Sequence, residues 1–209
     1  MQPVDLETLS RLLLARPETG RSLVAVAGPP ASGKSTLAEG LVERLNAERP
    51  GVAALLPMDG YHFDDLLLVP WRRRARKGAP DTFDVGGFRA MLRRLRDNAE
   101  EAIAVPVFDR DIEIARAGAR MIPNTARLIV VEGNYLLLRT PPWDTLKPLF
   151  DVTVMIETDA ETLRRRLTAR WQGYDLPADE VRRKVEENDL PNGLTVIADS
   201  AEADYVIAT

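Results

Sequence analysis

The stretch SLVAVAGPPASGKST, residues 22–36, decides the fold of this chain. Its first part, 22–27, is a short apolar run of small and β-branched residues, which is typical of a buried strand. Its second part, 28–35, fits the pattern G-x-x-x-x-G-K-[ST] at every fixed position. A helix is expected from Lys34 to about Asn46. A strand, a glycine-rich loop and a helix in this order predict a phosphate-binding loop.

Each part of this loop has a chemical use. Gly28 and Gly33 allow turn conformations in which several backbone N–H groups point inward, above the positive end of the following helix. Lys34 adds a point charge for the β- and γ-phosphates, and the Ser35 hydroxyl can bind Mg²⁺. The alternative is a chance glycine-rich turn between a strand and a helix. The predicted ATP-binding residues are Gly28, Pro29, Pro30, Ala31, Ser32, Gly33, Lys34, Ser35 and Thr36.

Strands and helices alternate along the rest of the chain. The expected elements are an N-terminal helix over 3–16, strands over 52–58, 127–131, 152–156 and 205–208, and helices over 88–103, 158–171 and 178–188. Such an alternation predicts a parallel sheet with helices on both faces. We therefore expect one α/β domain with the three-layer αβα fold of P-loop NTPases, and a lid at about 164–178.

Composition excludes several classes of site. The 209 residues are 45% apolar, enough for a substantial core, and contain no cysteine, so disulfides and cysteine-based metal sites are ruled out. The lone histidine, His62, rules out multi-histidine metal sites. A net charge of -4 argues against nucleic acid as the main partner. Charged residues interrupt the first 20 positions and no apolar run is long enough to span a bilayer, so we expect a cytoplasmic protein without a membrane partner.

Two carboxylates follow predicted strands. Glu132 ends the strand that begins at Arg127, and Asp59 follows the strand 52–58. Because the carboxyl ends of parallel strands meet at one edge of a sheet, both should lie beside the phosphate loop. There Glu132 can bind Mg²⁺ through water. Asp59 can also lie in the outer shell of Mg²⁺, or it can accept the proton of an attacking hydroxyl. The alternatives are a surface acid that caps its strand for Glu132 and a turn former for Asp59.

Two groups of basic residues have more than one interpretation. Arg166 and Arg170 are spaced i, i+4, just before a break at 173–177. On a closing lid they would stabilise charge on the γ-phosphoryl group and act in catalysis, whereas on a solvated helix face they would pair with nearby acids. The run WRRRARK, residues 71–77, is either a solvated loop or a gate near the acceptor or the phosphates. A nucleic-acid patch fits the acidic net charge less well.

Five segments together resemble the phosphoribulokinase/uridine kinase family of P-loop kinases. They are SLVAVAGPPASGKST, MDGYHFDD, KGAPDTFD, PVFD and VVEGNYLLL, which follow one another in the order of the family. The resemblance extends over most of the chain, and within the family it is strongest to bacterial fructose transport system kinases. Uridine and pantothenate kinases look like more distant relatives. The resemblance implies ATP-dependent phosphorylation of a small metabolite, with Mg²⁺.

The resemblance also implies roles for individual residues. It makes Asp59 the general base and turns Asp81 and Asp84 toward the acceptor. Asp109 falls in a segment that otherwise carries acceptor contacts, and Arg110 follows it. This sequence departs from uridine kinases here, because they carry a Tyr-Asp pair followed by a His-containing segment.

Two residues that follow the proposed base, after Gly60, complete the predicted acceptor site. The Tyr61 ring and the His62 imidazole can bind the hydroxyls or a ring of the acceptor, although Tyr61 can equally be core packing. A cluster of carboxylates suits a neutral polyol, since each accepts hydrogen bonds from hydroxyls.

The favoured hypothesis is in-line phosphoryl transfer from MgATP to a sugar, with a nucleoside or pantothenate as the alternative acceptor. A P-loop ATPase that acts with a macromolecular partner and a non-catalytic nucleotide-binding module are the other classes. Many relatives self-associate, so a homodimer is left open.

Overall fold

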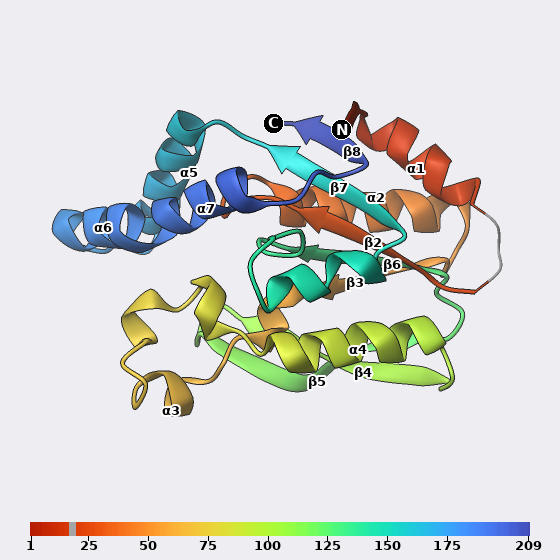
Figure 1. Ribbon diagram of the computed structural model, residues 1–209, viewed down its shortest axis with the longest axis horizontal. Coiled ribbons are helices and arrows are strands. Elements are labelled where there is room, and N and C mark those ends of the chain that lie inside the picture. Colours follow the sequence, from red (N-terminus) through yellow and green to blue (C-terminus); the bar gives the residue numbers. More distant parts are fainter. Residues whose placement is uncertain (17–19) are drawn as a thin grey trace.

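A six-stranded parallel sheet forms the centre of the protein (Figure 1). The computed structural model describes residues 1–16 and 20–209. The strands, in spatial order, are β1 (Gln2–Pro3), β8 (Tyr205–Ala208), β7 (Val152–Glu157), β2 (Ser22–Ala27), β6 (Leu128–Gly133) and β3 (Ala53–Pro57). All neighbouring pairs are parallel. The predicted α/β fold with a mostly parallel sheet is confirmed.

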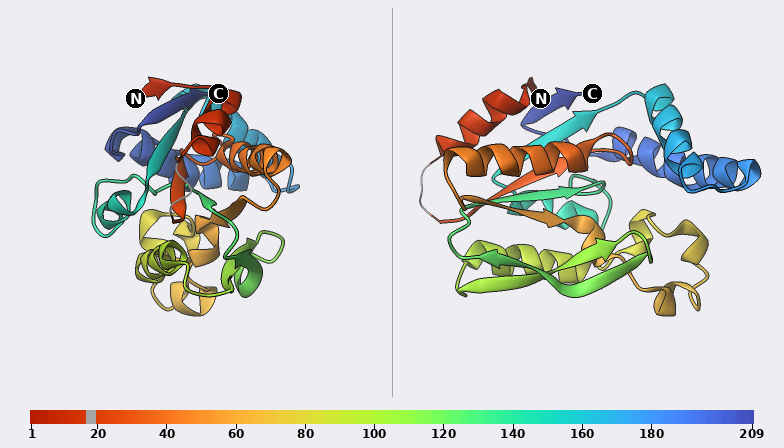
Figure 2. Two further views of the ribbon diagram at one scale, coloured as in Figure 1. Left: turned by 90° about the vertical axis from the view of Figure 1, so that its right-hand side faces the viewer. Right: turned by 180° about the vertical axis from the view of Figure 1, so that it is seen from behind.

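Side chains of β2 alternate between two apolar cores, one on each face of the sheet. Val24 and Val26 face α1 (Leu6–Leu14) and α2 (Lys34–Glu48). Seen from behind, these two helices lie over the sheet (Figure 2). Leu23, Ala25 and Ala27 belong to the second core. That core also contains residues of α4 (Val85–Asp97), of α7 (Leu190–Asp199) and of a separate antiparallel hairpin, β4 (Ala102–Asp109) and β5 (Ile114–Pro123).

Two predicted helices have the wrong bounds. The helix predicted over 88–103 runs from 85 to 97 and stops at Asn98, whose left-handed φ of 48° ends it. Residues from Ala102 onward alternate in burial and pair with β5, so this part of the prediction is wrong. The helix predicted over 3–16 begins later because the Asp5 side chain caps the Thr8 N–H, while β1 pairs with β8.

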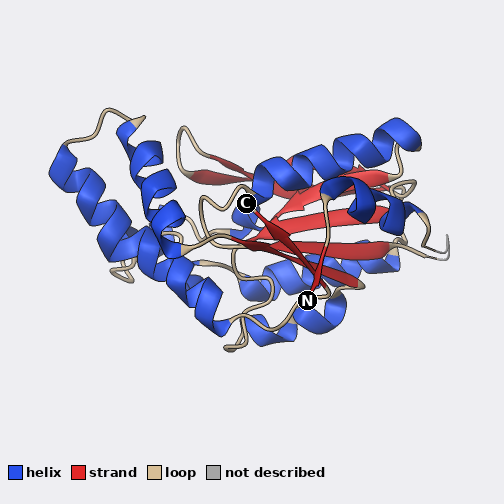
Figure 3. Cartoon of the chain, turned by 90° about the horizontal axis from the view of Figure 1, so that it is seen from above, coloured by secondary structure: helices blue, strands red, loops and turns tan. Residues whose placement is uncertain are grey.

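The last helices form an arm that projects beyond the sheet (Figure 3). It consists of α5 (Ala160–Gln172), α6 (Ala178–Lys184), a π-helical segment (Val185–Asp189) and α7. The arm has an apolar cluster of its own, in which α5 meets α6 and the π-helical segment. The predicted lid, 164–178, covers most of α5 and the turn into α6. The predicted break at 173–177 is that turn.

Two further features complete the fold. The short helix α3 (Asp65–Leu68) lies between β3 and α4 and precedes the basic run. Among the described residues, no helix is long and apolar enough to cross a membrane.

Candidate active site

The phosphate loop joins β2 to α2 as predicted. Gly33 and Ala31 take left-handed backbone angles, with φ of 89° and 60°. A Cβ on Gly28 would lie 2.8 Å from the Ser32 hydroxyl oxygen and 3.0 Å from Ile156 Cβ, so only glycine fits the start of the loop. The loop leads into the N-terminus of a 15-residue helix, and a loop of this kind at a helix N-terminus is suited to bind phosphate.

Ser35 and Glu132 lie together at the mouth of the sheet. The Ser35 hydroxyl donates to Glu132 Oε2 at 3.2 Å, and Glu132 is 5% exposed. Gly133 lets β6 end directly against Met58, because a Cβ there would lie 2.5 Å from Met58 Cβ. Pro57 pairs with Glu132 between β3 and β6, so Asp59, two residues later, lies close to Glu132.

A hydroxyl beside buried carboxylates fits Mg²⁺ that arrives with ATP. Magnesium is usually held by one or two protein ligands together with substrate phosphates and water. In the part of the chain that the structure describes, no group of three or more acidic or histidine side chains could hold a metal by itself. The pair Ser35 and Glu132 therefore fits a nucleotide-dependent magnesium site.

Burial and nearby charges shift the pKa values of this region. Burial raises the pKa of Glu132, against the opposing effect of Lys34. Burial lowers the pKa of Lys34, against Glu132 and Asp59, which raise it. Burial alone would raise the pKa of Asp59, but His62, Arg110 and other cations outweigh it and hold the pKa below its usual value. Asp59 is therefore ionised at neutral pH, as a general base must be.

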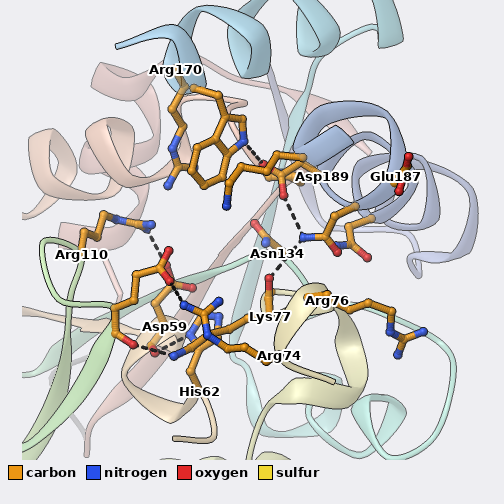
Figure 4. Close-up of a pocket in the computed structure, with 18 of the residues that line it drawn as sticks. Asp59, His62, Arg74, Arg76, Lys77, Arg110, Asn134, Arg170, Glu187 and Asp189 are labelled. Atoms are coloured by element: carbon orange, nitrogen blue, oxygen red, sulfur yellow. Dashed lines mark hydrogen bonds and ion pairs between the residues drawn. The ribbon is translucent and has the colours of Figure 1, made fainter. Parts of the chain in front are cut away.

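A cavity of about 870 Å³ opens next to the phosphate loop (Figure 4). Pro30 and Lys34 of the loop line one side of it. Most of the remaining lining comes from four places: Asp59 and His62, the basic segment 74–78, the β4–β5 hairpin near its turn, and the arm. Phe83 and Asn134 complete it. The cavity therefore lies where a nucleotide phosphate and a second substrate would meet.

Asp59 is held at the wall of this cavity by two neighbours. Its Oδ2 accepts from the Arg110 guanidinium at 2.6 Å, and its side chain is 19% exposed. Its backbone carbonyl lies 2.8 Å from His62 Nδ1. The His62 ring packs between Phe83 and Phe108, with centroids 4.0 and 4.6 Å away. The imidazole therefore fixes the backbone at the proposed base.

The basic run 71–77 is divided between the cavity and its outside. Arg74, Arg76 and Lys77 line the cavity, whereas the other two arginines of the run do not. Arg74 and Lys77 share the carboxylate of Asp65, at 2.6 and 2.8 Å. Both also contact Glu113, on the turn of the hairpin. The structure thus places part of the run where the gate interpretation requires it.

Four predicted acceptor residues are not among those that line this cavity. Tyr61 is buried against Phe88, with centroids 4.8 Å apart, and is part of the core. The other three are aspartates that already have partners. Asp81 pairs with Arg76 and Arg73, Asp84 caps α4 through the Gly87 N–H, and Asp109 pairs with Arg116.

The arm contributes cavity residues that the sequence did not single out. Trp171 donates its indole N–H to Asp189 at 2.7 Å, and Asn188 donates to the backbone carbonyl of Lys77 at 3.2 Å. Asn134, just after β6, also lines the cavity. Periodicity gave no sign of Asn188, because it lies in the π-helical segment, where the residues that face inward differ from those of a regular α-helix.

The two predicted arm arginines lie at different places. Arg170 lines the cavity and influences the pKa of both Lys34 and Asp59. Arg166, one turn earlier, instead donates to the Ser32 carbonyl and the Thr209 hydroxyl, both at 3.3 Å. Of the two, Arg170 thus faces the cavity and Arg166 contacts the phosphate loop.

Comparisons with known proteins give close relatives over most of the chain. A candidate uridine kinase of Schizosaccharomyces pombe is 31% identical over 195 residues, which is 90% of this chain and 83% of that protein. The uncharacterized protein YggC of Escherichia coli is 33% identical, over 97% of this chain and 83% of that one. The crystal structure of a candidate fructose transport system kinase from a Silicibacter species is 38% identical, covers 97% and 98% of the two chains, and superposes with a TM-score of 0.90. No family model matches the chain.

Proposed function

Because the chain belongs to the phosphoribulokinase/uridine kinase family of P-loop kinases, we propose that it transfers the γ-phosphoryl group of MgATP to a hydroxyl of a small metabolite, with a sugar as the preferred acceptor class. The observation that carries this proposal is Asp59, an ionised carboxylate in the wall of the cavity beside the phosphate loop. A carboxylate there can accept the proton of an attacking hydroxyl.

The mechanism follows from the positions of the residues. The loop amides and Lys34 hold the phosphates, and Ser35 and Glu132 would hold Mg²⁺, which neutralises phosphate charge when bound. The acceptor oxygen attacks the γ-phosphorus while the bond to the β–γ bridging oxygen breaks, and Asp59 takes the proton of the hydroxyl. Arg170, which lines the cavity, would stabilise the charge that spreads over the phosphoryl oxygens.

The surroundings of Phe108 favour a sugar over a nucleoside. A nucleoside base would need an open aromatic face for stacking. The ring of Phe108 instead lies 4.6 Å from His62, and cations lie over it, with Lys77 Nζ at 5.6 Å and the Arg110 guanidinium at 6.0 Å. Within the described cavity wall, this ring is therefore already covered. A relative named as a candidate fructose transport system kinase supports the same choice.

An acceptor panel tests the proposal. ATP consumption by the purified protein with Mg²⁺ is measured with sugars, sugar phosphates, sugar acids, uridine, cytidine and pantothenate, and the product is identified by mass spectrometry. We expect an acceptor-dependent rise over the basal rate. The Lys34→Ala variant should lose about 10²- to 10³-fold in kcat/KM, because an electrostatic contact to the phosphates is removed.

Two outcomes would contradict the proposal. Full activity of Lys34→Ala would refute the site itself. A steady ATPase rate that no acceptor changes, and that a macromolecular partner raises, would favour the ATPase alternative.

A further inference from the structure

The acceptor side of the cavity presents cations where the sequence predicted carboxylates. The basic side chains that line it beyond the phosphate loop and the arm are Arg74, Arg76, Lys77 and Arg110. The acidic ones are Asp59 and Glu113. Asp84 and Asp109 have partners that do not line the cavity, and Asp81 pairs with Arg76 from behind the lining. The side chains that line this part of the cavity are therefore four cations and two carboxylates.

Lys77 is the most enclosed of these cations. Its side chain is 7% exposed, and its Nζ donates to Asp65 at 2.8 Å and to the Glu113 carbonyl. The same ammonium lies over the ring of Phe108. Lysine is rarely buried, since removing its charge from water is costly. A positive charge held this rigidly in a cavity wall is suited to bind an anion.

Arg74 presents a guanidinium fork beside Lys77. Its Nε contacts Asp65, and its Nη2 contacts the Glu113 carboxylate. Glu113 lies on the hairpin turn with a left-handed φ of 52° and itself lines the cavity. Carboxylate and phosphate groups bind an arginine fork in the same way. The Glu113 carboxylate thus marks a position that an anionic group of a ligand could take over.

Asn134 adds a hydrogen-bond acceptor in the same cavity. Its Oδ1 is buried and has no partner. An unpartnered buried acceptor is unfavourable until a donor arrives. A hydroxyl of the bound acceptor is a suitable donor. Figure 4 shows Asn134, Lys77 and Arg74 gathered near Asp59.

Resting on the proposed kinase function, we propose that the acceptor is an anionic hydroxy compound whose carboxylate or phosphate group is bound by Arg74 and Lys77. Its anionic group replaces the Glu113 carboxylate on Arg74. One of its hydroxyls then faces Asp59, and another donates to Asn134. This narrows the sugar class to sugar acids and sugar phosphates.

Matched pairs of acceptors test the charge requirement. The pairs are fructose with fructose 1-phosphate and with fructose 6-phosphate, glucitol with gluconate, and glycerol with glycerate. We expect kcat/KM to be at least about tenfold higher for the charged member of a pair. Comparing the phosphorylated acceptors with the carboxylic acids tells which anionic group is preferred. A preference for the neutral members overturns the proposal.

Two variants locate the effect. Arg74→Gln should raise the KM for the charged acceptor about 10- to 100-fold and leave the KM for ATP unchanged. Arg73→Gln is the matched control, because it removes the same charge from the same run without lining the cavity. Lys77→Gln should act like Arg74→Gln, provided that its melting temperature shows a folded protein. Equal effects of Arg73→Gln and Arg74→Gln would overturn the assignment.

A binding measurement separates this inference from the proposed function. Calorimetric titration of the Asp59→Asn variant, saturated with a non-hydrolysable ATP analogue, needs no phosphoryl transfer. If no panel member is phosphorylated, the proposed function fails, but tighter binding of the charged members would still support the anion site. No difference between charged and neutral members in this titration overturns it.

Discussion

The two halves of the cavity are built in different ways. The phosphate half comes from one continuous segment, 28–36, in which backbone N–H groups and a helix end would contact the phosphates. The acceptor half is assembled from side chains on at least four segments, which are far apart in the sequence, from Asp59 to Asn188.

The difference explains which half can vary. A backbone cradle depends on glycine positions and on the strand and helix around it, so it recognises the phosphate that all nucleotides share. A wall of side chains can change with each substitution without disturbing the sheet. Acceptor specificity therefore lies in the half that the fold constrains least.

The largest effect should come from Asp59→Asn, which removes the proposed base at nearly constant shape. We expect kcat to fall by about 10²- to 10⁴-fold, because no carboxylate remains to take the proton. The KM for ATP should change little, since the phosphate half is intact. Steady-state kinetics with the best acceptor measure both values. Unchanged kcat would remove Asp59 from the mechanism.

The two arm arginines provide a comparison within one helix. Arg170→Gln should lower kcat by about 10²-fold, because its charge faces the reacting groups. Arg166→Gln should mainly raise the KM for ATP, by less than about tenfold, since it loses only hydrogen bonds to Ser32 and Thr209. The opposite ranking in kcat would exchange the roles of the two residues.

Gly133→Ala tests the close packing of β6 against Met58. The new Cβ would meet Met58, so we expect a loss of about 1–3 kcal/mol in unfolding free energy, which is roughly 2–10 °C in melting temperature. Gly86→Ala in α4 is the control, because its nearest atom, on Asp84, would be 3.6 Å away. If the two variants melt together, the close approach of β6 to Met58 is not required.

The smallest effect concerns the pH dependence of stability at His62. Burial lowers the pKa of this imidazole in the folded protein, with a partial offset from Asp59. The unfolded chain then binds more protons, so the neutral ring contributes stability that is full above pH 6.5 and is lost as the pH falls through the folded pKa.

Thermal melting of wild type and His62→Gln between pH 5 and 8 checks this direction. On acidification the melting temperature of the wild type should fall further than that of the variant, by at most about 2–4 °C. His62 is the chain's only histidine, and Glu132 titrates in both proteins, so the difference reports on His62 and on Asp59, whose pKa His62 helps to lower. A larger loss in the variant would reverse the sign assigned to His62.

Local patterns in the sequence were enough to predict the parallel sheet and the phosphate loop. Strand β2, the start of α2 at Lys34 and the last strand, β8, lie where periodicity and turn signals placed them. These features depend on neighbours in the chain: alternating burial, glycine freedom and a helix start. The places of Asp59 and Glu132 followed as well, since strand ends share one edge of a parallel sheet.

Only the tertiary structure decided the acceptor side. The β4–β5 hairpin carries Arg110 and Glu113 to the cavity, and its pairing is a contact between segments that no local pattern specified. Whether an aspartate faces a cavity, caps a helix or pairs with an arginine depends on what packs around it. The sequence alone therefore determined a phosphate-binding α/β fold with a carboxylate at its edge, and long-range packing decided which charges a second substrate meets.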